Sequence, residues 1–106
     1  MGLLNFLRGP DINQGAAECA ATPGAVLLDV RTPGEYREGR VPGSKNLPLD
    51  ALRRAPEVIE SRDTPVFVYC YSGARSRQAA GLLAGMGYTN VKNIGGIAAW
   101  QGEIES

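Results

Sequence analysis

Histidine is absent from the 106-residue chain. This absence excludes the Ser–His and Cys–His pairs that activate many catalytic nucleophiles, and it removes the most common metal-binding side chain. Cysteine is scarce: Cys19 and Cys70 lie far apart and form no CxxC pair, which argues against a zinc site. We therefore expect no metal and no other cofactor, and any cysteine chemistry must be activated without histidine.

An excess of charge of one sign is also missing, because 11 basic residues balance 11 acidic ones. This balance predicts neither a nucleic acid nor an anionic membrane as partner. Lysine is rare, with only Lys45 and Lys92, so nearly all the basic residues are arginines, whose planar guanidinium suits small oxyanions. This composition fits a small anionic substrate.

Long apolar runs are absent, so we expect no integral membrane segment. The start, MGLLNFLRGP, lacks the charged leader and apolar stretch of a signal peptide, and we expect a cytoplasmic protein. The length suits one domain, with residues 1–10 as an N-terminal extension and residues 11–106 as the domain. The apolar side chains of the extension, Leu3, Leu4, Phe6 and Leu7, are expected to pack on the domain or to be disordered, with contact to a partner or membrane surface as the alternative.

Short β-like runs alternate with helix-like stretches, which predicts an α/β domain on a largely parallel sheet. The expected strands cover residues 25–30, 46–49, 65–69 and 89–93. The expected helices cover residues 14–21, 34–38, 51–54 and 74–86, with a restart at Pro56 and a closing turn over 97–101. Thr32 and Asp50 are the expected N-caps of two of these helices.

Cys70 is the most informative residue, because a predicted strand ends there and a helix follows within a few residues. Ligands of parallel α/β sheets bind at this carboxyl edge. A tight loop at this point turns backbone N–H groups inward, Gly73 permits the required conformations, and the helix N-terminus adds partial positive charge. These effects favour thiolate over thiol, so we expect a lowered pKa for Cys70.

Residues 70–76, CYSGARS, resemble the active-site loop of the rhodanese family, with its pattern C-x-x-G-x-R-[ST]. Residues 27–36, 39–49 and 95–102 are similar to three further family segments, in the family's order, so the resemblance covers residues 25–102. It implies a rhodanese-like α/β fold, with a small, mostly parallel central sheet flanked by helices on both faces. Two positions depart from the family: Arg40 replaces a common histidine, and Tyr71 replaces a frequent cation, which weakens the case for thiosulfate as the physiological donor.

The activity implied by this resemblance is sulfur transfer, with Cys70 as the catalytic residue that carries a persulfide. The implied donor is a small anion, either thiosulfate or a persulfide, the acceptor is cyanide or a thiol, and a sulfur-relay protein is a further partner. Arg75 either orients the donor or pins the loop by pairing with Glu35, and both alternatives stay open. The remaining implied substrate-binding residues are Tyr71, Ser72, Gly73, Ala74 and Ser76. Asp29 and Arg31 are expected to hold loops near the site by hydrogen bonds.

Three other functions compete with sulfur transfer. A cysteine phosphatase of the C-x5-R type needs arginine six positions after the cysteine, where this chain has Ser76. Arsenate reduction by a related loop is a similar minor alternative. A non-catalytic binding module is disfavoured because the loop cysteine is retained. Among single residues, Cys19 is expected to be a small packing residue rather than a resolving thiol, and Gly95 with Gly96 indicates a close backbone approach.

Overall fold

Four parallel strands form the central sheet, and the order across it is β2-β1-β3-β4. The computed structural model describes residues 9–106, so the apolar side chains of the extension lie outside the described residues. The strands are β1 (Val26–Asp29), β2 (Lys45–Asn46), β3 (Val66–Cys70) and β4 (Val91–Gly96). In register, Asp29 of β1 lies beside Tyr69 of β3, and Cys70 lies beside Gly96 of β4. The predicted α/β fold with a parallel sheet is confirmed.

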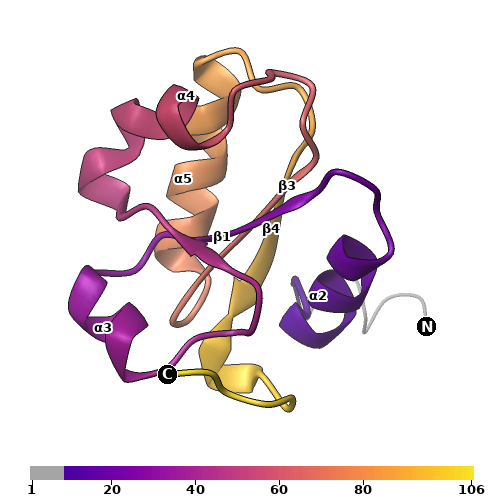
Figure 1. Cartoon of the computed structure of the whole chain (residues 1–106), viewed down its shortest axis with the longest axis vertical. Helices are drawn as coiled ribbons and strands as arrows, with labels where there is room; N and C mark the ends of the chain where they lie inside the picture. Colours follow the sequence, from indigo (N-terminus) through magenta and orange to yellow (C-terminus); the bar gives the residue numbers. More distant parts are fainter. Residues whose placement is uncertain (1–8) are drawn as a thin grey trace.

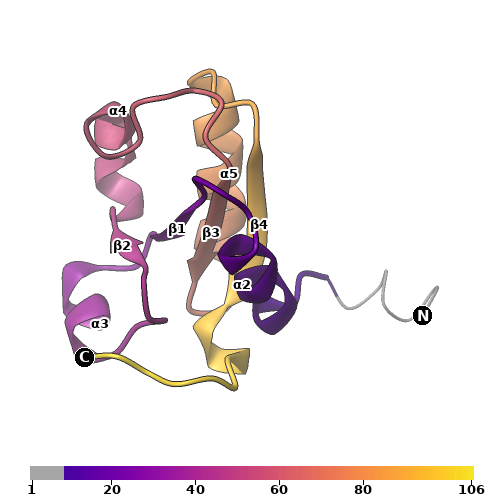
Figure 2. The same ribbon diagram turned by 45° about the vertical axis from the view of Figure 1, so that its right-hand side comes forward.

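Helices cover both faces of this sheet (Figures 1 and 2). They are α2 (Ile12–Ala20), α3 (Pro33–Glu38), η1 (Leu49–Arg54), α4 (Ala55–Val58), α5 (Ala74–Gly85) and η2 (Ile97–Ala99). One face packs against α2, and the other packs against α5 and η1. Between residues 9 and 106, none of these helices combines the length and the apolar character that a membrane crossing requires.

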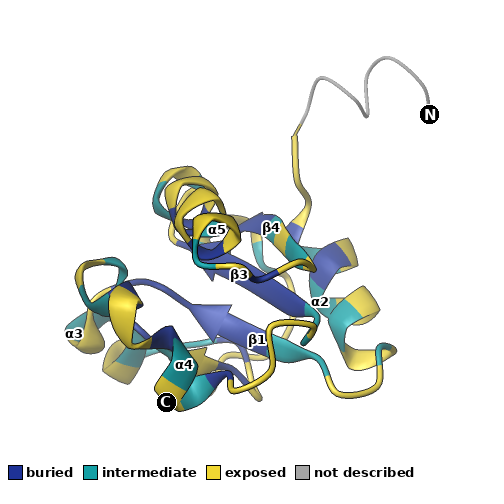
Figure 3. Cartoon of the chain, turned by 90° about the horizontal axis from the view of Figure 1, so that it is seen from above, coloured by how far each residue is buried: buried dark blue, intermediate teal, exposed yellow. Residues whose placement is uncertain are grey.

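Side chains of β3 alternate between two cores, as the pleat of a strand requires. Val66, Val68 and Cys70 join the core under α5, whereas Phe67 and Tyr69 join the core under α2. The strand is buried along its whole length (Figure 3). A strand buried on both faces is encoded by a continuous apolar run, which is why the sequence predicted a strand at residues 65–69.

Of the two N-caps predicted from the sequence, the structure confirms one and contradicts the other. Thr32 caps α3, and Glu35 returns a bond to the Thr32 backbone, which completes a capping box. The predicted cap at Asp50 is wrong: the turn η1 begins at Leu49, Pro48 stands at its N-cap, and Asp50 lies inside it. The turn therefore starts two residues earlier than a cap at Asp50 would place it, directly after Pro48, whose ring fixes φ.

The last strand is longer than predicted, since β4 continues through Gly95 and Gly96. Glycine disfavours strands, so the pattern indicated an end at Asn93. The structure explains the exception. A register shift marks the pairing with β3, Gly95 has φ +103, and a Cβ at Gly96 would collide with the Tyr71 carbonyl oxygen. The predicted close backbone approach at Gly95 and Gly96 is therefore confirmed.

Candidate active site

Cys70 is the last residue of β3, and α5 begins four residues later. Between them Gly73 adopts φ +104, a left-handed conformation that turns its N–H back toward the strand. This N–H donates a hydrogen bond to the Cys70 Sγ across 3.0 Å. The loop after the cysteine therefore directs a backbone donor at the sulfur.

The surroundings of Cys70 change the pKa of its thiol in two opposed ways. Burial raises this pKa, whereas the Ser76 hydroxyl and the loop amides lower it, and the second effect is larger. The amides involved are those of Ser76, Gly73 and Ser72. Cys70 therefore has a lowered pKa without any histidine, in the direction that the sequence predicted.

Cys70 is buried, with 1% of its surface exposed to solvent. The loop residues that follow it, Tyr71, Ser72 and Ala74, are all exposed. The sulfur therefore belongs to the end of a buried strand, at the point where an exposed loop begins. Burial keeps water away from the sulfur, and hydrogen bonds to charge are stronger where water is excluded.

Ser76 is fully buried in the first turn of α5, and its side chain makes no helix cap. Its Oγ lies 2.7 Å from Asn93 Oδ1 and 3.1 Å from the Gly73 carbonyl oxygen. A hydroxyl has one proton, and the shortest contact directs it to Asn93. We therefore attribute the lowered pKa of Cys70 chiefly to the amides. Asn93 was missed in the sequence, where its only signal was a polar residue near the end of a predicted strand.

Arg75 pairs with Glu35 of α3 in a two-pronged contact. Arg75 Nη1 lies 2.7 Å from Glu35 Oε1, and Nη2 lies 3.0 Å from Oε2. The hydrogen bond from Arg75 is the main cause that lowers the pKa of Glu35 to about 2, with Thr32 adding to it. Of the two alternatives for Arg75, the ion pair is present, and it ties α5 to α3 across the end of the sheet.

Asp29 and Arg31 form a second pair, which is buried at the end of β1. Arg31 Nη2 donates to Asp29 Oδ2 and to the Gly39 carbonyl oxygen, each across 2.7 Å. Asn46 of β2 adds bonds from its side-chain amide to the carbonyl oxygens of Asp29 and Arg31. The pair thus connects the end of β1 with the Gly39 carbonyl after α3.

A hollow of about 540 Å³ lies beside the cysteine loop. Its lining includes Tyr71, Ser72, Gly73, Arg77 and Asn93. Arg77 is exposed, and within residues 9–106 no carboxylate lies within ion-pair distance of it, whereas Arg31 and Arg75 are both paired. The guanidinium available to an anion at this hollow is therefore that of Arg77.

Cys19 and Cys70 belong to opposite faces of the sheet. Cys19 is half-buried and packs with the core under α2, and burial raises the pKa of its thiol. This placement agrees with a packing role for Cys19 rather than that of a resolving thiol. In the described part of the chain, cysteine and acidic side chains form no group of three that suits a metal ion.

Comparison with known proteins gives one consistent family. The family described as "Rhodanese-like domain" matches residues 14–103. A sulfurtransferase of Allochromatium vinosum is 38% identical over 100 residues, which cover 92% of this chain and 89% of that protein. The thiosulfate sulfurtransferase PspE of Escherichia coli is 39% identical over 71 residues, which cover 66% of this chain and 68% of PspE. A solved structure of a rhodanese with anions from E. coli is similar with a TM-score of 0.71 and 34% identity, over 76% of this chain and 96% of that one.

Proposed function

This chain belongs to the rhodanese-like domain family and is a sulfurtransferase of the rhodanese type, and from that premise we propose that Cys70 carries the sulfur as a persulfide. The observation that supports this role most directly is the 3.0 Å hydrogen bond from the Gly73 amide to the Cys70 Sγ, together with the lowered pKa of that thiol. A thiolate is the nucleophilic form of cysteine, and here backbone amides favour it in place of a histidine.

The proposed first step uses thiosulfate as the test donor. The Cys70 thiolate attacks the outer sulfur of thiosulfate, an S–S bond forms on Cys70, and the sulfur–sulfur bond of the donor breaks with both electrons leaving on sulfite. The product is a Cys70 persulfide that keeps one negative charge. In the second step cyanide attacks the outer sulfur and leaves as thiocyanate, or a thiolate attacks and leaves as a persulfide, and the Cys70 thiolate is restored. Two half-reactions of this kind give ping-pong kinetics.

The loop residues 71–76 are the proposed binding surface for the donor and the persulfide. Amides of this loop meet the negative sulfur and stabilise it by charge-assisted hydrogen bonds. Because Nη1 and Nη2 of Arg75 both donate to the Glu35 carboxylate, we propose that Arg75 holds the loop in place. We assign the contact with the anionic end of the donor to Arg77, which lines the hollow beside the loop.

The proposed acceptors are small thiophiles, and a sulfur-relay protein is a further proposed partner. Tyr71 directly follows Cys70 and is 55% exposed, so its side chain is available to contact an acceptor or partner. A phosphatase of the C-x5-R type is not favoured, because the position it requires for arginine holds the buried Ser76.

The decisive experiment measures sulfur on the protein itself. The purified chain is incubated with thiosulfate, glutathione persulfide or mercaptopyruvate, and intact-mass and peptide-level mass spectrometry locate any added sulfur. We expect a gain of one sulfur atom on Cys70, with mercaptopyruvate the poorest donor, and we expect cyanide to remove it as thiocyanate. Cys70→Ser abolishes the gain, and the matched variant Cys19→Ser keeps it.

Two results would contradict the proposed function. One is that no donor in the panel adds sulfur to Cys70, which favours a binding module. The other is that the chain releases phosphate from an aryl phosphate, with loss of that activity in Cys70→Ser, which favours the phosphatase.

A further inference from the structure

Asn93 lies on β4, outside the loop that contains Cys70, and it contacts three parts of the site. Resting on the proposed role of Cys70, we propose that Asn93 is a positioning residue that keeps the loop amides directed at the Cys70 sulfur. It acts through Ser76 and Gly73, and it need not touch the donor.

The contacts of Asn93 converge on the residues that surround the sulfur. Its Oδ1 accepts from Ser76 Oγ across 2.7 Å and from the Gly95 amide across 3.0 Å. Its Nδ2 lies 3.5 Å from the carbonyl oxygen of Gly73, whose own amide donates to Cys70 Sγ. One side chain therefore connects β4, the cysteine loop and the first turn of α5.

The bond between Asn93 and Gly95 is a local turn of the kind in which an Asn side chain binds the backbone two residues ahead. It lies where the pairing of β4 with β3 shifts register, so the regular ladder does not by itself fix the backbone there. The glycines that follow lie against the cysteine loop, because a Cβ on Gly96 would strike the Tyr71 carbonyl. Asn93 thus fixes the backbone on which the loop rests.

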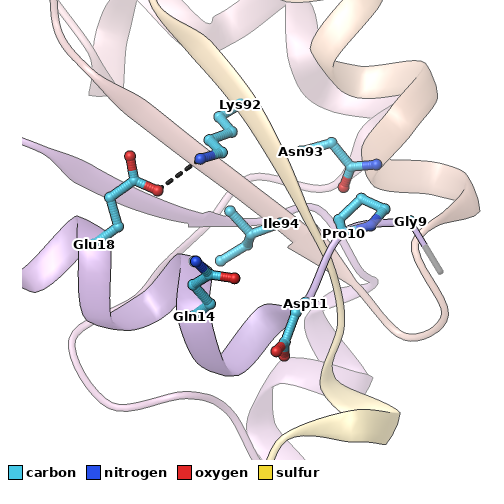
Figure 4. A pocket seen from close by; sticks show the side chains of 9 residues that line it. Gly9, Pro10, Asp11, Gln14, Glu18, Lys92, Asn93 and Ile94 are labelled. Carbon is cyan, nitrogen blue, oxygen red and sulfur yellow. Dashed lines mark hydrogen bonds and ion pairs between the residues drawn. The ribbon is translucent and has the colours of Figure 1, made fainter. Parts of the chain in front are cut away.

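The side chain of Asn93 extends from β4 away from the ion pair of Lys92 and Glu18 (Figure 4). Lys92 is the preceding residue, and its Nζ lies 2.6 Å from Glu18 Oε1 on α2. Neighbouring residues of a strand point to opposite sides. Lys92 therefore offers a matched control on the same strand, since it makes a tertiary contact but faces away from the cysteine loop.

Removal of the Asn93 amide has a defined effect on the site. The Ser76 hydroxyl and the Gly95 amide lose their acceptor, and buried donors without partners drive local rearrangement. The next acceptor for the Ser76 proton is the Gly73 carbonyl at 3.1 Å, so the proton turns to the loop rather than to the sulfur. The loop amides then lose alignment with Cys70, and the thiolate loses part of its stabilisation.

The test measures the alkylation rate of Cys70 by iodoacetamide as a function of pH, in a Cys19→Ser background with a single thiol. This measurement needs no sulfur donor, so its outcome is independent of whether sulfur transfer is demonstrated. For Asn93→Ala we expect a midpoint at higher pH and a rate at pH 7 reduced roughly two- to tenfold. Lys92→Ala should leave both quantities at the parent value.

A second set of variants separates positioning from general destabilisation. If Asn93 acts through Ser76, Cys70 in the double variant Asn93→Ala with Ser76→Ala is alkylated no more slowly than in the slower single variant. Asn93→Asp keeps both oxygen contacts and adds a negative charge near the loop. It replaces Asn93→Ala in the test if that variant does not fold, and we expect it too to raise the midpoint pH of alkylation. Unchanged midpoints in Asn93→Ala and Asn93→Asp, or a shift of equal size in Lys92→Ala, overturn the proposal.

Discussion

Replacement of Glu35 by Gln is the substitution whose effect the structure allows us to estimate best. Glu35 accepts hydrogen bonds from both Nη atoms of Arg75, and this ion pair lowers the pKa of Glu35 from 4.5 to about 2. A shift of this size corresponds to roughly 3 kcal/mol for a fully buried pair. About a third of each side chain is exposed, so solvent screening reduces the expected loss in the free energy of unfolding to about 1–2 kcal/mol at pH 7.

The pH dependence of this loss has a definite sign. The pKa of Glu35 is lower in the folded chain than in the unfolded chain, so the unfolded chain binds the proton more readily as the pH falls. The stabilisation by Glu35 is therefore complete above pH 4.5 and is lost as the pH falls from about 4.5 to about 2. Gln does not titrate, so the difference between the parent chain and Glu35→Gln narrows over this window.

The assay is urea unfolding of both proteins at pH 7, 5 and 3.5, combined with sulfur-transfer kinetics at pH 7. If Arg75 holds the loop, Glu35→Gln lowers kcat because the loop amides are less well fixed. If Arg75 instead binds the donor, its release from Glu35 lowers the KM for thiosulfate. A stability difference that stays constant from pH 7 to pH 3.5 would refute the assignment of the low pKa to this pair.

Two further substitutions test the loop from other directions. Gly96→Ala places a Cβ against the Tyr71 carbonyl oxygen, and we expect it to lower the free energy of unfolding by roughly 3 kcal/mol. The control is Gly81→Ala on α5, where a Cβ meets no atom within 4 Å, and we expect it to be neutral or slightly stabilising. Equal effects of the two substitutions in urea unfolding would contradict the expected collision at Gly96. Arg77→Ala should raise the KM for thiosulfate roughly three- to tenfold with little change in kcat. The control is Arg62→Ala, beside the far end of α5, which should leave this KM unchanged. An unaltered KM in Arg77→Ala would show that Arg77 does not bind the donor.

The sequence predicts the strand–loop–helix around Cys70 because each part has a local signal. The strand is a continuous apolar run, Gly73 marks the turn, and Gly87 marks the end of the helix that follows. The N-cap at Thr32 is also predicted locally, because Thr32 is followed by Pro33 in the first helical turn. These features depend on residues close in the chain, so no knowledge of the fold is needed to find them.

The sequence does not predict the contacts made across the sheet. Asn93 and Ser76 are 17 residues apart and meet only because β4 lies beside β3 and α5 packs on both. The two readings of Arg75 also had equal support until the fold brought α3 near the first turn of α5. The near-complete burial of Cys70 likewise depends on the assembled fold, because this residue stands between the buried Tyr69 and the exposed Tyr71.

The placement of the two arginines after the loop supports transfer of a sulfur atom over transfer of a phosphoryl group. A phosphoryl group exposes several charged oxygens, and a guanidinium fork binds such oxygens in pairs. Here Arg75 is turned to Glu35 on the β1 side of the loop, and Arg77 lines the hollow on the β4 side. Between them stands Ser76, buried and bonded to Asn93. Ser76 occupies the position that a C-x5-R loop gives to arginine, and the hydrogen bond that reaches the Cys70 sulfur comes from a backbone amide, that of Gly73.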